Sequence, residues 1–167
     1  MKKATTHILA AASFAALFAT LPAAHAHGGG EHRSQAKISA EEHPFGRQGD
    51  PKKATRTIGI DMSDDMRFSP AEITVRQGET IRFVVRNKGK MLHEMVIGTM
   101  DELNAHAEMM RKHPGMEHDE PYMSHVNAGK KQTLVWQFSK AGEFYFACLI
   151  PGHFEAGMVG KIKVTKG

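Results

Sequence analysis

Short segments in which apolar and polar residues alternate occupy most of the C-terminal two-thirds of this 167-residue chain. Alternation places every second side chain on the same face, a pattern typical of half-buried β-strands. Turn sequences that contain glycine separate several of these segments. The predicted strands cover residues 55–60, 72–75, 80–86, 132–138, 143–148 and 161–164. Many short strands at regular spacing predict an all-β protein with the architecture of a β-sandwich.

Residues 99–125 depart from the alternation. Within this segment, residues 101–112 have acidic side chains at the start and basic ones at the end, and a Pro-Gly pair follows. This arrangement predicts a short helix. At about 100° per residue, Leu103, Ala107 and Met110 fall on one stripe of that helix. We therefore expect a helical insertion between the strands, rich in methionine and histidine.

The first 26 residues have the three parts of a secretory signal peptide. A basic start at Lys2 and Lys3 precedes an apolar stretch over residues 8–21, and Ala24-His25-Ala26 forms a small-x-small cleavage site. The apolar stretch is too short to span a bilayer, and no cysteine stands at the cleavage site to accept a lipid. We therefore expect a periplasmic protein whose mature form has no membrane anchor.

Residues 27–53 are rich in glycine, serine, glutamine and charged residues and show no sustained period, so we expect a disordered, histidine-bearing tail. Residues 54–167 then form one domain with a single core. The formal charge of +4 falls to +2 once Lys2 and Lys3 leave with the signal peptide, because that segment holds no acidic residue. Such a balance gives no reason to expect a nucleic acid or an anionic lipid as a partner.

The one cysteine, Cys148, is followed at five-residue intervals by His153 and Met158. A thiolate and an imidazole with a weak axial thioether favour copper in a trigonal electron-transfer site, and a second histidine would complete this ligand set. His93 is the best candidate, because it begins an apolar run after a turn sequence. Taken singly, such residues are more commonly a buried thiol, a surface or strand-edge histidine and a core methionine. Their joint spacing between two strands favours the metal site.

The pattern Cys148-x4-His153-x4-Met158, with His93 upstream, resembles the type 1 copper site of the cupredoxins, and its loop spacing is most similar to that of the auracyanins. The resemblance covers residues 54–167 apart from the insertion. It implies a Greek-key β-sandwich in which these four side chains bind one copper ion, with a partly exposed His153 through which electrons pass. Glu94 stands where azurin-like proteins usually carry asparagine, so we expect different hydrogen bonds to the ligand loop.

The insertion and the tail carry further residues that could bind copper, because thioethers select Cu(I) and imidazoles can share it. These secondary candidates are His106, Met109, His113, Met116, His118, Met123 and His125, together with His27 at the expected new N-terminus. Two interpretations stay open for each group. The helical residues either bind additional Cu(I) or only pack on the sandwich and face water. The tail either chelates Cu(II) through His27, with His32 and His43 nearby, or is a polar spacer.

Two classes of function compete. The insertion and the tail make the chain similar to the periplasmic cupredoxins associated with copper tolerance, which implies a redox-active protein that handles Cu(I) and Cu(II). The alternative is a small soluble electron carrier of a periplasmic redox chain, in which the insertion is a docking surface. We do not expect an enzyme, since multicopper oxidases need several His-x-His pairs and nitrite reductases need a second domain. The expected partners are copper ions and an unidentified periplasmic redox or copper-trafficking protein.

Overall fold

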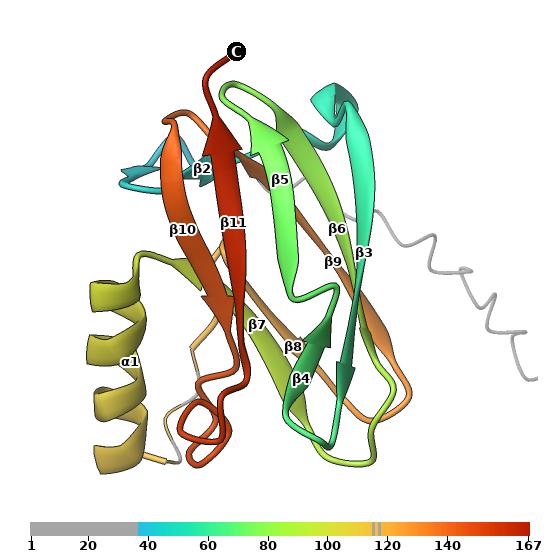
Figure 1. Ribbon diagram of the computed structural model, residues 1–167, viewed down its shortest axis with the longest axis vertical. Coiled ribbons are helices and arrows are strands. Elements are labelled where there is room, and N and C mark those ends of the chain that lie inside the picture. Colours follow the sequence, from blue (N-terminus) through green and yellow to red (C-terminus); the bar gives the residue numbers. More distant parts are fainter. Residues whose placement is uncertain (1–36, 115, 117) are drawn as a thin grey trace, which may run out of the picture. The chain divides into compact units, whose positions relative to one another are not determined.

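The computed structural model describes residues 37–114, 116 and 118–167, which form two β-sheets packed face to face (Figure 1). One sheet contains, in spatial order, β1 (Glu42–His43), β2 (Gly46–Gln48), β9 (Lys131–Gln137), β6 (Thr80–Asn87), β3 (Arg56–Ser63) and β4 (Arg67–Ser69). The other contains β5 (Glu72–Arg76), β11 (Val159–Thr165), β10 (Gly142–Ala147), β7 (His93–Gly98) and β8 (Met123–Val126). A 3-10 turn, η1 (Pro51–Lys53), and a helix, α1 (Met100–Lys112), are the other described elements. The expected all-β sandwich with one short helix is confirmed.

The chain crosses repeatedly between the two sheets. β5, which lies between β4 and β6 in the sequence, belongs to the sheet opposite them and pairs in parallel with β11. β3 and β6 likewise pair in parallel. These crossings give the Greek-key arrangement of the sandwich. In the second sheet β7 pairs antiparallel with β10, and Val96 lies opposite Ala147. This pairing brings the beginning of β7 beside the end of β10.

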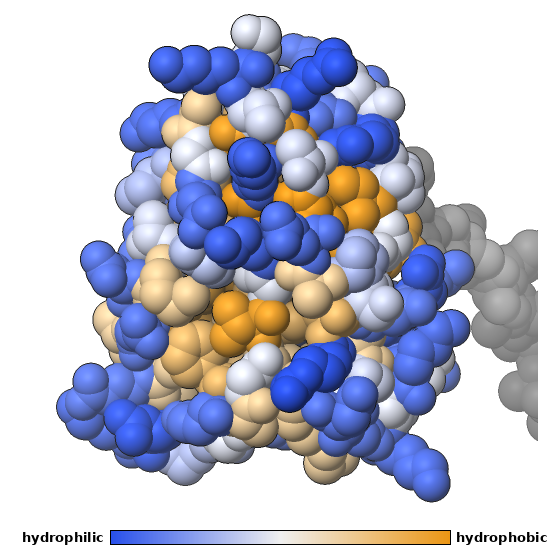
Figure 2. All heavy atoms as spheres, in the orientation of Figure 1, coloured by the Kyte–Doolittle hydropathy of each residue, from blue (hydrophilic) through white to orange (hydrophobic). Residues whose placement is uncertain are grey.

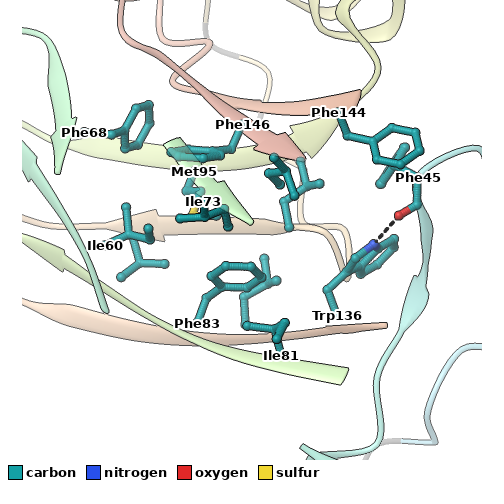
Figure 3. Close-up of a cluster of buried hydrophobic side chains, with 14 of the residues drawn as sticks. Phe45, Ile60, Phe68, Ile73, Ile81, Phe83, Met95, Trp136, Phe144 and Phe146 are labelled. Atoms are coloured by element: carbon teal, nitrogen blue, oxygen red, sulfur yellow. Dashed lines mark hydrogen bonds between the residues drawn. The ribbon is translucent and has the colours of Figure 1, made fainter. Parts of the chain in front are cut away.

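The core forms where the alternating patterns of the two sheets meet. Ile81, Phe83 and Val85 of β6 are fully buried. On the neighbouring strand β9, Trp136 lies opposite Ile81 and Leu134 lies opposite Phe83. Figure 3 shows aromatic and aliphatic side chains of both sheets interleaved between the layers. Each such buried side chain contributes about 1.5–3 kcal/mol relative to exposure to water.

Residues 42–53 are ordered, in contrast to the predicted disordered tail. β2 pairs with β9 and extends the first sheet. Phe45 is buried and stacks on Trp136, whose Nε1 donates a hydrogen bond of 2.9 Å to the Phe45 carbonyl oxygen (Figure 3). Burial of Phe45 and pairing with the edge of the first sheet thus order this segment, although most of its residues are polar. The prediction of disorder is wrong for residues 42–53, while residues 1–36, including the expected signal peptide, lie outside the described part of the chain.

Helix α1 begins at a capping box. The Thr99 side chain accepts a hydrogen bond from the Glu102 amide, and the Glu102 carboxylate accepts one from the Thr99 amide. The predicted stripe of Leu103, Ala107 and Met110 is the buried face of the helix, as expected. It packs on the second sheet with residues of β7, β8 and β10. Among the described residues, no helix has the length and apolar character required to cross a bilayer.

Three further strands, β4, β7 and β8, were not among those predicted from the sequence. β7 is buried along its whole length and so shows no alternation. β4 has three residues, too few to display a period. β8 begins inside the predicted insertion and ends one residue beyond it; it pairs antiparallel with β7 and places Val126 opposite His93. The C-terminal part of the insertion is therefore an edge strand of the second sheet, and the preceding helix packs against that sheet.

Candidate metal centre

The loop between β10 and β11 carries three of the predicted ligands, Cys148, His153 and Met158. Hydrogen bonds within the backbone fold the loop back on itself, since the Cys148 amide donates to the Met158 carbonyl and the Met158 amide donates to the His153 carbonyl, each over 3.1 Å. Gly152 and Gly157 have φ angles of +90° and +86°, which side chains with a Cβ rarely adopt. These two glycines therefore permit the tight turns of the loop.

His93 reaches the same place from β7. The donor atoms of His93, Cys148 and His153 all lie within 4.8 Å of one another. Cys148 Sγ is 3.3 Å from His153 Nδ1, and the two imidazole rings have their centroids 4.9 Å apart. His93 and Cys148 are fully buried and His153 is half-buried. The structure thus brings together a thiol and two imidazoles, three of the four residues that the sequence predicted.

Asp64 orients His93 through a contact that was not predicted from the sequence. Asp64 Oδ1 lies 3.0 Å from His93 Nε2, while Oδ2 accepts a hydrogen bond of 2.8 Å from the Lys90 amide. That amide and, after it, the contact with His93 lower the pKa of Asp64, which keeps it an ionised acceptor. His93 Nε2 therefore carries the proton, and Nδ1 presents its lone pair. Nδ1 is buried and has no hydrogen-bond partner among the described residues, as expected of a metal ligand.

Glu94, the residue after His93, holds the start of the ligand loop through both its backbone and its side chain. Its amide donates to Cys148 Sγ over 3.4 Å, and its Oε1 accepts a hydrogen bond of 2.7 Å from the Leu149 amide. A carboxylate in this position thus fixes the start of the ligand loop. We expected Glu94 to change the hydrogen bonds to the ligand loop, and in the structure its carboxylate accepts the Leu149 amide.

The protonation of the site suits a metal ion. Burial raises the pKa of the Cys148 thiol to about 12, so without a metal the sulfur keeps its proton. A coordinating thiol is deprotonated by the cation itself, and binding then releases that proton. Burial, followed by the neighbouring His93, lowers the pKa of His153 and favours the neutral imidazole. Neutral imidazoles and a thiolate are the ligand forms that copper requires.

Met158 closes the loop and is fully buried. Its backbone is tied to both Cys148 and His153, so its position in the chain is fixed beside these two residues. Its role as a weak axial ligand stays a prediction from the sequence.

The secondary candidates divide into two groups. The Nε2 atoms of His106 and His118 lie 2.7 Å apart, and the ring centroids of His118 and His125 are separated by 6.4 Å. Of the other candidates, Met109 and His113 are exposed, Met116 is exposed on the hollow that His118 and His125 line, Met123 is buried between α1 and the second sheet, and His27 lies outside the described residues. His43, expected near His27 in the tail, instead packs among aromatic rings.

A Greek-key sandwich with a thiol and two imidazoles converging at one end defines a cupredoxin. Residues 54–165 match the family model described as copper binding proteins, plastocyanin/azurin family. The chain belongs to this family.

Relatives and solved structures agree with this assignment. The copper-resistant cuproprotein CopI of Rubrivivax gelatinosus is 55% identical over 151 residues, which cover 90% of this chain and 92% of that protein. CopI of Pseudomonas aeruginosa is 36% identical, over 72% of this chain and 82% of that protein. Auracyanin B has a TM-score of 0.60 at 19% identity and covers 75% of this chain and 99% of its own. The auracyanin of Roseiflexus castenholzii has a TM-score of 0.58 at 23% identity, covers 67% and 98%, and like auracyanin B shows the shared fold.

Proposed function

We propose that this protein binds one type 1 copper ion in the periplasm and takes part in copper tolerance by holding copper as both Cu(I) and Cu(II). The observation that carries the proposal is the convergence of the His93, Cys148 and His153 donor atoms within 4.8 Å. The relation to copper-resistant cuproproteins over nearly the whole chain supports the role in tolerance. Met158 is the proposed axial ligand.

The residues around the site act by keeping the ligands in place. A bound copper ion would supply one-electron redox chemistry. Asp64 fixes the ring of His93, and Glu94 fixes the backbone at Cys148 and Leu149. The backbone bonds within the loop restrain His153 and Met158. Ligands that are held before the metal binds and that move little between oxidation states permit fast electron exchange.

An apolar surface beside the site suits a protein partner. Met91 and Leu92, which precede His93, are 42% and 44% exposed. Figure 2 shows apolar side chains gathered on the lower part of this face, over the region that the β10–β11 loop occupies in Figure 1. Exposed apolar groups next to a half-buried ligand such as His153 suit contact with a redox or copper-trafficking protein of the same compartment.

The first prediction tests the copper site by its colour. Cys148→Ser should abolish the intense visible absorption of the copper-loaded protein, because the thiolate supplies the charge transfer. Met158→Leu should keep a coloured but altered spectrum, because an axial thioether binds weakly. Absorption spectra of the purified, copper-loaded variants provide the measurement. An intense visible band in the Cys148→Ser protein would sink the assignment.

The second prediction separates copper tolerance from the alternative, an electron carrier. Cells that lack this protein should become sensitive to added copper, and the wild-type chain should restore their growth whereas the Cys148→Ser chain should not. Growth over a series of copper concentrations is the measurement, with equal periplasmic amounts of both proteins as the control. If tolerance is unchanged but respiratory growth without added copper is lost, the electron-carrier function replaces the proposed one.

A further inference from the structure

Two adjacent residues of β7 face opposite sides of the second sheet, as successive residues of a strand do. His93 turns toward the copper site. Glu94 is also buried, and its Oε2 lies 2.8 Å from Nε2 of His125 on the neighbouring strand β8. Because Oε1 accepts the Leu149 amide, one carboxylate contacts both the ligand loop and a histidine outside it. The proposed copper site does not use this second contact.

Three histidines from separate elements meet on that side of the sheet. His106 comes from α1, His118 from the connection after it and His125 from β8. The Nε2 atoms of His106 and His118 are 2.7 Å apart, so the two rings point their nitrogens at a common position. Nδ1 of His118 is buried and has no hydrogen-bond partner among residues 37–114, 116 and 118–167. Two imidazoles that share one hydrogen bond therefore leave a buried polar atom unsatisfied, which is costly unless a ligand changes the arrangement.

The charge state of the cluster suits a cation with nitrogen ligands. Burial, and then the proximity of His118, lowers the pKa of His106 and keeps its ring neutral. The carboxylate of Glu94, which is buried, contacts the cluster through His125. Imidazoles joined by a carboxylate are a ligand set for copper or zinc, and copper binds more tightly than zinc to a given set.

An opening leads to this position. Glu94, His118 and His125 line a surface hollow of about 850 Å³. Met116 and Asp119 lie on the same hollow, so thioether and carboxylate groups border the way in. A binding position for an exchangeable ion needs such an entry path.

We propose that His106, His118 and His125 bind a second copper ion, and that Glu94 connects it to the type 1 site through His125 and Leu149. The proposal that a second ion binds depends only on this histidine cluster. The proposed connection through Glu94 also rests on the proposed function of the main site. Copper held here would be an accessible store separated from the main ion by the backbone of β7. Filling it would pull on the carboxylate that fixes the start of the ligand loop.

The experiment uses zinc as a colourless probe, added to the full mature protein that carries one equivalent of copper at the main site, so that the second site is free to take up zinc. Zinc cannot displace copper from the main site, because copper binds the more tightly to a given set of ligands. We expect His118→Ala and His106→Ala to weaken zinc binding by about 100-fold, the upper end of what lost support around a metal costs. His113→Ala, which removes an exposed histidine just after the same helix, is the matched control and should bind zinc as the wild type does. The N-terminal histidines are the same in all four proteins, so their contribution cancels in the comparison.

The visible spectrum tests the connection through Glu94. Zinc should shift the absorption of the copper-loaded wild-type and His113→Ala proteins and leave that of His118→Ala unchanged. Equal zinc affinity in all variants would overturn the second site, and a spectrum insensitive to bound zinc would overturn the connection. In a Cys148→Ser background, the additional loss of zinc binding on His118→Ala should persist. Zinc binding in this background therefore tests the second site independently of the colour of the main site.

Discussion

Asp64 determines which nitrogen of His93 faces the proposed copper site. It does so from the turn between β3 and β4, and Gly89 makes the approach possible. A Cβ added to Gly89 would lie 1.9 Å from Asp64 Oδ1, closer than any real side chain permits. The carboxylate also accepts the backbone amides of Lys90 and Met91, so it holds the whole segment before β7. One exposed acidic residue thus sets both the ring and the backbone of a buried ligand.

The third prediction concerns this contact. Asp64→Ala should lower copper affinity by about 10- to 100-fold, as expected when a hydrogen-bond partner of a metal ligand is lost. Competition with a copper chelator measures the affinity. Asp65→Ala is the control, because Asp65 is also exposed and adjacent but contacts Ser63 in place of His93. Equal affinities for the two variants would contradict the positioning role of Asp64.

Site residues that lie close together in the sequence could be predicted, whereas residues that meet only in the folded structure could not. Cys148, His153 and Met158 share one loop, so their spacing was visible as a motif. Asp64 meets His93 across 29 positions, and acidic residues in turns are too common to signal such a contact. Glu94 was recognised as a departure from the family pattern. Its hydrogen bond to Leu149 could not be predicted, because it depends on the pairing of strands that are distant in the sequence.

At the scale of elements, α1 is attached to the sandwich by its apolar stripe. The fourth prediction is that Leu103→Ala destabilises the protein by about 2–5 kcal/mol, because Leu103 is fully buried and its removal leaves a cavity. Met109→Ala on the same helix should change stability by no more than about 0.5 kcal/mol, because Met109 is exposed. Urea unfolding of both variants gives the comparison. Equal stability of the two proteins would show that the helix does not depend on this contact.

Elements with a visible period were predictable, whereas very short strands and the fully buried β7 were not. The alternation of β6 and the helical stripe of α1 each involve enough residues to show a period. β1, β2 and β4 have two or three residues each and exist because a neighbouring strand offers hydrogen bonds. Because residues 42–53 are mostly polar, the sequence did not indicate that Phe45 among them is buried. Tertiary packing, which a local pattern cannot contain, ordered this segment.

For the whole molecule, a bound ion should add to the stability of the fold. The fifth prediction is that copper at a thousandfold excess over its dissociation constant stabilises the protein by about 4 kcal/mol, because the unfolded chain has no assembled site. Thermal unfolding with and without copper measures the gain. The Cys148→Ser protein should show a much smaller one. Equal melting temperatures of the wild type with and without copper would contradict the prediction.

The bond from the Glu94 amide to Cys148 Sγ joins positions 54 residues apart. The ligands therefore come together only after β7 and β10 have paired, and loop closure over such a distance is among the slower steps of folding. A refolding chain supplied with copper should gain colour at that step and not before. The absorption of the proposed copper site would thus be a built-in probe of one long-range strand pairing, observable without any added label.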